Sequence, residues 1–322
     1  MPENPKLFIH NVPIEICTSV QRGLPFVHTM YMEMLLKGIL AAAQSMFPIT
    51  ICHLIIMANH IHLLAIVQNP EDVPKFMDYF KTEVAHAVNR LMGTTGQSFW
   101  VSGYDSPSIL SAEKFLERME YLYLNPVKAK IVRSSCKYQG LSTHKLLSQQ
   151  TTVEEHKKVS REQLKELPRG SLSKSFQSEL VRSFREGKGC MNVLKIEPWA
   201  WLKCYEESKD WNTEAVQKRF LTQLEESEER LKRQNPSILG KASNQNIRIP
   251  YRSRRYGLKM ICLSDCPKQR SSFISTFKAL AHLARVAYQL TKQGIRTSPP
   301  PGFFLPGGAL LANLVLTSSF LY

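Results

Sequence analysis

Two histidines inside an apolar run are the residues of this sequence best suited to metal chemistry. His60 and His62 stand two residues apart in the segment MANHIHLL, residues 57–64. On a β-strand, side chains at i and i+2 leave the same face, so the two imidazoles can hold one divalent cation. Neutral imidazole is the commonest side-chain ligand for such ions. A lone histidine in a strand is usually a core residue, but two on one face would crowd each other unless a metal joins them.

A second pattern follows about sixty residues later, in the segment YLYLNP, residues 121–126. Tyr121 and Asn125 are four residues apart and share a face if the segment is helical. A free phenol has a pKa near 10 and is a poor nucleophile at neutral pH, so it needs help from a nearby positive charge. A two-histidine metal site and a tyrosine together suit the opening of a DNA strand through a covalent phosphotyrosine. Tyr121 or Tyr123 could instead be an aromatic residue packed on the sheet.

The elements that must position these motifs follow an α+β pattern. The hydrophobic periodicity predicts a third helix that begins after Ser111 and runs through Tyr121, with Asn125-Pro126 marking its end region. The order β-α-β-β-α-(β)-α is close to the ferredoxin-like fold, an antiparallel sheet with helices on one face. The strand with the two histidines would then be central, and the helix with Tyr121 would cross its face. The predicted strands are 7–20, 49–57 and 60–67, the other helices are 28–47 and 71–92, and 100–110 holds a loop with a short strand.

The charge divides the chain into two unequal halves. Residues 1–150 hold 13 Lys and Arg against 11 Asp and Glu, whereas residues 151–322 hold 29 against 16, a net of +13. A half this basic indicates a polyanionic partner, most often nucleic acid, although it could be only a basic soluble domain. We predict a catalytic domain over 1–145, a polar linker over 146–175 and a basic, mainly helical region over 176–322.

Within the basic region, one segment interleaves arginines with tyrosines. Arg252, Arg254 and Arg255 could neutralise phosphates while Tyr251 or Tyr256 stacks on an unpaired base. The alternative is an arginine-rich loop that ties two helices together. Trp199 and Trp201 are interpreted as core residues.

The cysteines and the chain ends bear on the compartment. The seven cysteines form no Cys-x-x-Cys pair, which indicates reduced thiols in an intracellular protein. No signal peptide is evident, and the uncharged segment 303–322 is broken by Pro306, Gly307 and Gly308. The unbroken remainder is shorter than the roughly 20 residues that span a bilayer, so we expect no membrane partner. The expected location is the cytoplasm, in association with the nucleoid.

The two motifs together resemble the single-tyrosine, His-hydrophobic-His (HUH) transposases, particularly the REP-associated tyrosine transposases. The resemblance covers roughly residues 5–145 and includes Phe99-Trp100 and Tyr104-Asp105 between the motifs. Ala58 departs from the family, which commonly has proline there; the change affects the stiffness of the turn rather than the ligands.

The resemblance implies a role for each matching residue. Tyr121 matches the family's nucleophile, and Asn125 matches the position that completes the metal site with His60 and His62. The implied enzyme is a transposase and endonuclease that cuts and rejoins single-stranded or hairpin DNA through a 5′-phosphotyrosine, with Mg²⁺ or Mn²⁺. The family often works as a dimer, which the sequence leaves open. The absence of a P-loop agrees with chemistry that conserves bond energy and needs no nucleotide.

The basic residues around Tyr121 are candidate DNA contacts. Arg118 and Lys114 lie one and two turns before it, and Lys128 follows the motif. For each of them a solvated surface role is an equally good interpretation.

Two other functions compete with the transposase. The first is a domesticated protein that recognises repeat hairpins for the upkeep of these elements without transposing; the intact ligands and nucleophile argue against a dead enzyme. The second is a His-x-His hydrolase of nucleotides. Its histidine-triad form needs a third histidine where this chain has Leu64, so it is discounted.

Overall fold

The four strands nearest the two histidines form the antiparallel sheet expected from the sequence. The computed structural model describes residues 5–21, 29–94, 96–168, 173–234, 237–238 and 260–304. Strands β2 (Pro13–Ser19), β3 (Thr50–Ile56), β4 (His60–Ile66) and β5 (Ser108–Ile109) lie in the order β3-β4-β2-β5. With α1 (Met30–Met46) after β2 and α2 (Asp72–Leu91) after β4, this is the ferredoxin-like arrangement. The predicted α+β fold class is confirmed.

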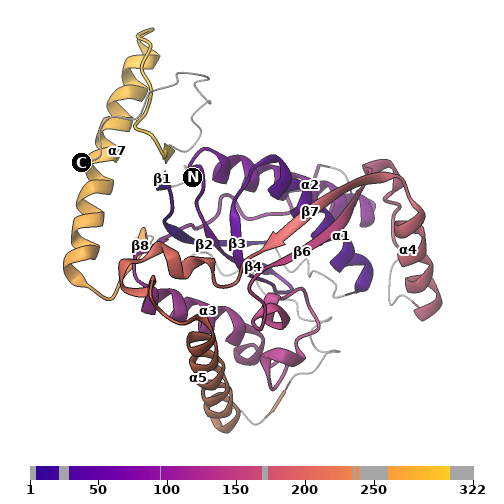
Figure 1. Ribbon diagram of the computed structural model, residues 1–322. Coiled ribbons are helices and arrows are strands. Elements are labelled where there is room, and N and C mark those ends of the chain that lie inside the picture. The colour runs from indigo at the N-terminus through magenta and orange to yellow at the C-terminus, as the bar shows by residue number, and fades with distance from the viewer. Residues whose placement is uncertain are drawn as a thin grey trace.

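The alternation of side chains along β4 divides the sheet into two faces. Ile61, Leu63 and Ala65 belong to the apolar core formed with α1 and α2. The intervening Leu64 and Ile66 belong to a second core on the opposite face, formed with α3 (Ala112–Lys128). Since side chains of a strand alternate in direction, His60 and His62 share the face of α3. The prediction of helices on one face therefore holds for α1 and α2, while α3 covers the other face (Figure 1).

Helix α3 continues past the proline at which the sequence predicted its end region. Pro126 lies within the last turn, where it has no N–H to offer the carbonyl of Leu122. The side chain of Asn125 compensates, because its Nδ2 donates to the carbonyl oxygens of Tyr121 at 2.9 Å and Leu122 at 3.4 Å. At the other end Ser111 accepts a hydrogen bond from the Lys114 amide, as a helix cap does.

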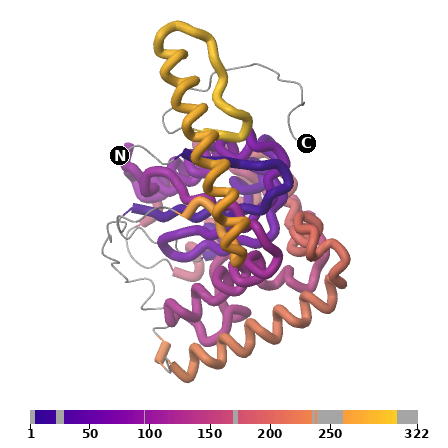
Figure 2. The backbone as a smooth tube through the Cα atoms, turned by 90° about the vertical axis from the view of Figure 1, so that its left-hand side faces the viewer, coloured from indigo at the N-terminus to yellow at the C-terminus, as the bar shows by residue number. Residues whose placement is uncertain are grey.

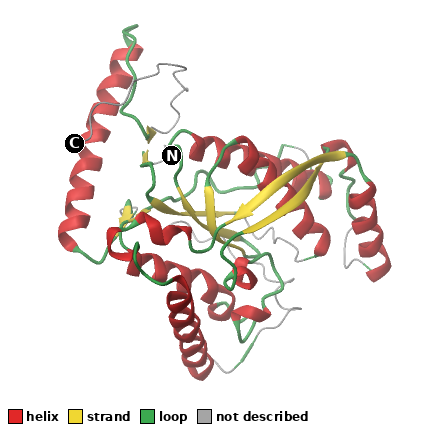
Figure 3. Cartoon of the chain, in the orientation of Figure 1, coloured by secondary structure: helices red, strands yellow, loops and turns green. Residues whose placement is uncertain are grey.

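The sheet extends beyond the four predicted strands on both sides. At one edge, β6 (Thr152–Val159) and β7 (Gly189–Ile196) form a hairpin whose strand β7 runs parallel to β3. At the other edge, β8 (Cys262–Leu263) pairs in parallel with β5, so the whole sheet is mixed (Figure 3). The polar stretch assigned to a linker therefore contains a strand of the main sheet. The independence of residues 1–145 as a folding unit stays a prediction.

The chain beyond the hairpin is mainly helical, as expected. Helix α5 (Thr213–Gln234) packs on α3, where Arg219 pairs with Glu113 and Gln223 donates to Glu120. Trp199 and Trp201 are buried in the core beneath them, as the sequence indicated. The remaining helices are α4 (Lys174–Glu186), α7 (Pro267–Lys292) and the 3₁₀ segments η1 (Ser135–Lys137), η2 (Thr143–Leu146), η3 (Arg161–Gln163), η4 (Ala200–Cys204) and η5 (Glu206–Ser208).

Helix α7 is attached to the body along one side. Its neighbour β9 (Phe303–Phe304) pairs with β1 (Lys6–Leu7), and Phe277 packs against Phe303. The backbone trace shows α7 crossing the β8 edge and rising beyond the sheet (Figure 2). Among the helices that the structure describes, none is both long and apolar enough to cross a bilayer. All seven cysteines have free thiols.

Candidate active site

The two histidines of β4 lie side by side with one nitrogen of each ring already engaged. Their ring centroids are 5.1 Å apart. Nδ1 of His60 is 2.6 Å from Oδ1 of Asn59, and Nδ1 of His62 is 2.9 Å from Oε1 of Glu15. Metal-binding histidines commonly use one nitrogen for such a partner and the other for the ion. The two Nε2 atoms are therefore the candidate ligand atoms.

Asn125 is placed to supply a third ligand atom. Its amide nitrogen is committed to backbone carbonyls of α3, and its side chain also forms a hydrogen bond with His60. This leaves the amide oxygen as the atom that faces the histidines. Among the described residues, no three His, Cys, Asp or Glu side chains are grouped to hold a metal. Two imidazoles and an amide oxygen fit a divalent ion that takes its other ligands from a phosphate.

Glu15 is the functional residue that the sequence analysis missed. This buried carboxylate of β2 binds His62 through Oε1 and accepts hydrogen bonds from Arg118, 2.7 Å from Nε to Oε2 and 2.9 Å from Nη2 to Oε1. Burial raises the pKa of Glu15, but the hydrogen bonds and charges of His62 and Arg118 outweigh burial and lower it overall. A single glutamate in the apolar strand PIEICTS was the available signal.

The two histidines have opposite tendencies to hold a proton. Burial and the charge of His62 lower the pKa of His60 to about 4, against the hydrogen bond with Asn125 that raises it. Burial also lowers the pKa of His62, but Cys17 and Glu15 overcome it and raise the value to about 9. Without a metal, His60 is neutral at pH 7 and His62 carries a proton. A metal ion on His62 must therefore displace that proton.

Tyr121 lies against this cluster and between two cations. Its ring centroid is 5.6 Å from that of His62, with the rings nearly perpendicular. The guanidinium carbon of Arg118 is 4.2 Å from the ring centroid and Nζ of Lys128 is 4.6 Å from it. The ring is half-buried, so it is held in place while one side stays open to a substrate. Arg118 thus contacts both Glu15 and Tyr121 and joins the metal-site histidine to the tyrosine.

Tyr123 occupies a different environment that suits a structural role. Its side chain is fully buried, and its hydroxyl is 2.8 Å from Nδ1 of His53 and 3.0 Å from Oγ1 of Thr143. Burial raises the pKa of this phenol well above its usual value. A strand of DNA cannot reach it without opening the core. Between the two tyrosines of the motif, this placement favours Tyr121 as the nucleophile.

The residues predicted to bind DNA have varied surroundings. Lys114 forms ion pairs with Glu117 and, at 2.6 Å, with Asp265, so its charge is largely used within the protein. Arg118 and Lys128 both lie on the tyrosine ring; Arg118 is also held by Glu15, whereas Lys128 is exposed. Arg252, Arg254 and Arg255 fall outside the described residues.

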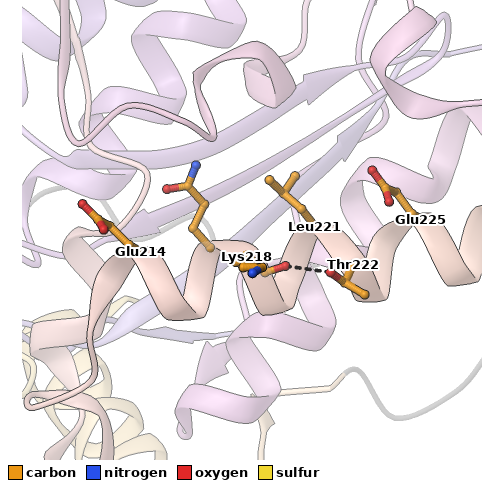
Figure 4. Close-up of a pocket in the computed structure, with 6 residues that line it drawn as sticks. Glu214, Lys218, Leu221, Thr222 and Glu225 are labelled. Carbon is orange, nitrogen blue, oxygen red and sulfur yellow. Dashed lines mark hydrogen bonds between the residues drawn. The ribbon is translucent and has the colours of Figure 1, made fainter.

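A surface hollow of about 330 Å³ lies elsewhere, along helix α5 (Figure 4). One helix supplies its entire lining, which includes Glu214, Lys218 and Leu221. It contains no histidine, tyrosine or cysteine, and it does not include any residue of the His60 and Tyr121 cluster. The hollow is therefore not the candidate site.

Comparison with known proteins agrees with the resemblance seen in the sequence. Residues 14–122, about a third of the chain, match the family model described as "Transposase IS200 like". This segment begins on β2 beside Glu15 and ends just after Tyr121, so it spans both motifs apart from Asn125. The predicted resemblance is confirmed for these residues. No curated protein matches the sequence.

Two solved structures are similar over part of the chain. A REP-associated tyrosine transposase bound to a REP hairpin is 17% identical, with 45% of this chain and 84% of that chain covered and a TM-score of 0.40. A Deinococcus radiodurans protein described as a candidate transposase is 16% identical, with 38% and 95% covered and a TM-score of 0.28. Both TM-scores are below 0.5, so these structures carry no argument, and the family model supports the resemblance over residues 14–122.

Proposed function

We propose that this chain, whose residues 14–122 match the IS200-like transposases, is a metal-dependent enzyme that cleaves and rejoins DNA through Tyr121. The substrate is single-stranded or hairpin DNA, and the intermediate is a 5′-phosphotyrosine. The observation that carries the proposal is the contact of the Tyr121 ring with His62, 5.6 Å between ring centroids, in a half-buried cluster of opposite charges.

The reaction proposed for Tyr121 is a phosphoryl transfer that conserves the number of bonds. The phenol oxygen forms a bond to phosphorus and loses its proton to solvent or to a base. The bond from phosphorus to the 3′ oxygen of the preceding nucleotide breaks, and that oxygen takes up a proton to become a 3′-OH. Attack by a 3′-OH on the phosphotyrosine reverses the step and rejoins DNA. One P–O bond is formed for each P–O bond broken, so the reaction needs no external energy source.

His60, His62 and the amide oxygen of Asn125 are the residues that would hold Mg²⁺ or Mn²⁺. When bound, such an ion supplies positive charge to the non-bridging oxygens of the scissile phosphate. The chain's own cations, Arg118 and Lys128, lie on the tyrosine ring, where their positive charges would face the phosphate that Tyr121 attacks.

Glu15 has a positioning role in this proposal. It fixes the ring of His62 through Nδ1 and fixes Arg118 through two hydrogen bonds. One buried carboxylate thus orients both His62, the proposed metal ligand, and Arg118, which lies on the ring of Tyr121. Removal of such an outer partner commonly lowers metal affinity or activity by about 10–100-fold. We expect a loss of about this size when Glu15 is replaced.

The test is the formation of a covalent adduct. Purified protein is incubated with labelled hairpin-bearing single-stranded DNA from the flanks of its own gene, with Mg²⁺, with Mn²⁺ and with chelator. We expect a metal-dependent labelled species on a denaturing gel. The species should disappear in Tyr121→Phe and persist in Tyr123→Phe, once melting curves show that both variants are folded. Tight binding with no adduct under any condition would instead support the domesticated hairpin-binding protein.

A further inference from the structure

Nearly all of the net charge of this protein lies in its last 93 residues. Residues 230–322 contain fifteen Lys and Arg and a single acidic residue, Asp265, a net of +14 in a chain whose total is +15. The structure describes residues 230–234, 237–238 and 260–304 of this segment, including helix α7. Asp265 is already paired with Lys114 of α3. No other acidic residue in this part of the sequence offsets the remaining positive charge.

Helix α7 displays part of this charge as a straight stripe. Lys278, Arg285 and Lys292 follow one another at intervals of seven residues, and all three are exposed. At a rise of about 1.5 Å per residue, they lie about 10 Å apart along one side of the helix and span about 21 Å. His282 and Gln289, also exposed, fill the positions between them. The helix contains no Asp or Glu at all.

This stripe is separate from the side of α7 that packs on the body. Phe277, Ala281 and Ala284 are buried in a small core with Leu7 and Phe303. In the described part of the chain, the three basic residues take part in no ion pair with a carboxylate, although Nζ of Lys292 lies 4.9 Å from the ring centroid of Tyr288. The helix is thus anchored by one side while the basic side faces solvent.

Helix α7 begins at the β8 edge of the sheet, level with Ala65 of β4 and close to the N-terminal end of α3, where Asp265 pairs with Lys114. It follows β8, which pairs with β5, which in turn pairs with β2, the strand of Glu15. Gln269 in its first turn donates to the carbonyl of Leu110, directly before α3. With strands about 4.8 Å apart, β8 lies about 14 Å from β4. Figures 1 and 2 show the second half of α7 rising clear of the sheet. DNA that runs from Tyr121 past Lys114, two turns earlier on α3, would meet the start of α7 and could then follow the helix away from the sheet.

We propose that the basic stripe of α7 (Lys278, Arg285 and Lys292) binds the phosphate backbone of the duplex part of the DNA substrate. This inference rests on the proposed function, because it takes the DNA at Tyr121 to be continuous with a duplex stem. Sites for single strands combine a basic groove with aromatic rings on which bases stack. The stripe instead lies on a convex helix rather than in a groove, and Tyr288 beside Lys292 is the one exposed Phe, Tyr or Trp ring on α7. Regularly spaced cations on a rigid helix suit the regular, densely charged backbone of a duplex.

The test compares the salt dependence of binding for three DNA probes. They are a blunt hairpin, the same hairpin with a single-stranded extension, and an unpaired strand of equal length. The variant K278Q/R285Q/K292Q removes the stripe. The matched control, K174Q/R182Q/K188Q, removes the same charge from exposed positions on and after α4, at the far end of the sheet. Fluorescence anisotropy gives Kd between about 50 and 200 mM salt, the range over which phosphate contacts are revealed.

We expect the stripe variant to bind both hairpins at least about tenfold more weakly at low salt. The slope of log K against log salt should fall by about 2 to 3, since each lost phosphate contact removes about 0.9. The unpaired strand should bind as it does to the wild type, and the control variant should lose little on any probe. Equal losses for the stripe and control variants, or equal losses on paired and unpaired DNA, would overturn the proposal.

The adduct assay separates this inference from the proposed function. Adduct formed by the stripe variant on an unpaired strand at saturating protein shows that the Tyr121 chemistry does not depend on α7. If the wild type forms no adduct on any DNA, the proposed function fails whatever the binding data show. If the adduct forms and duplex binding is unchanged in the stripe variant, only the inference about α7 fails.

Discussion

Strand β4 presents very different side chains to the two faces of the sheet. Toward α1 and α2 it presents Ile61, Leu63 and Ala65, which are buried in a wholly apolar core. Toward α3 it presents His60 and His62 before returning to apolar Leu64 and Ile66. A continuous apolar face stabilises the strand order, so the other face can accommodate a buried polar cluster. The apolar face therefore stabilises the fold, whereas the residues that we propose carry the chemistry lie on the face of α3.

The largest expected effect on stability belongs to the apolar face. Leu63→Ala leaves a cavity beneath α1 and α2 and should lower the free energy of unfolding by about 2–5 kcal/mol. Urea denaturation measures this change. Tyr121→Phe, on the other face, should change stability by less than about 0.5 kcal/mol while abolishing the adduct. If Tyr121→Phe proves as destabilising as Leu63→Ala, the two faces are not separable in this way.

A smaller effect is expected when the support of His62 is removed. Glu15→Gln eliminates the charge that binds His62 and Arg118, and should weaken Mn²⁺ binding by about 10–100-fold. Isothermal titration calorimetry measures the affinity without reference to activity. Glu33→Gln, a surface carboxylate of α1 on the opposite face, is the matched control. Unchanged Mn²⁺ affinity in Glu15→Gln would show that Glu15 does not position the ligand.

Metal binding should also depend on pH in a direction set by His62. Its pKa is raised to about 9, so at pH 7 Mn²⁺ must displace about one proton, and affinity should rise up to about tenfold per pH unit until pH 9. His60, with a pKa lowered to about 4, contributes no proton above about pH 5. Titrations in two buffers of different ionisation enthalpy count the protons released. Mn²⁺ binding with no proton release at pH 7 would contradict the assignment of His62 as a protonated ligand.

The smallest effect concerns the ion pairs that join α2 to β6 and to the segment that follows it, on the same side of the sheet as the apolar face. Glu83 pairs with Lys158 at 2.7 Å and with Arg161, and these partners lower its pKa against the effect of burial. A lowered carboxyl pKa gives stability that is present above the unfolded value and lost as the pH falls through the folded one. Glu83→Gln should therefore cost about 1 kcal/mol at pH 7, and the cost should shrink as the pH falls below the ordinary carboxyl pKa of about 4.5 and on through the lowered folded value. A pH-independent loss would indicate a packing effect instead of an ionic one.

Much of the fold could be predicted because its signals are local. The hydrophobic periodicities of α1, β3, β4 and α2 lie within each element, and the elements begin and end within a few residues of their predicted positions. The course of α3 was harder to predict. The side chain of Asn125 donates hydrogen bonds to the carbonyls of Tyr121 and Leu122, and these bonds help the helix to continue through Pro126. They depend on the rotamer of Asn125, which helix propensity does not predict. Strand β6 was assigned to a linker because its pairing with β7 depends on tertiary contacts rather than on an apolar pattern.

The candidate site shows the same division between local and tertiary information. His60, His62 and Tyr121 were found because their spacing and types are visible in two short segments, and the structure brings His62 and Tyr121 into contact. Glu15 was missed because its partners are 47 and 103 residues away along the chain. The contacts of Arg118 with Glu15 and Tyr121 are seen only in the tertiary structure, and its predicted contact with DNA stays a prediction. The metal and the catalytic roles of these residues stay predictions.

The central claim is that Tyr121 becomes covalently attached to DNA. It is tested most directly by mass spectrometry of the protein after reaction with a hairpin-bearing single strand and Mn²⁺, followed by proteolysis and fragmentation of the modified peptide. We predict a 5′-phosphonucleotide attached to Tyr121, released as a 3′-OH strand attacks it. A modification on Tyr123 or another residue, or cleaved DNA with no modified tyrosine, would contradict the account.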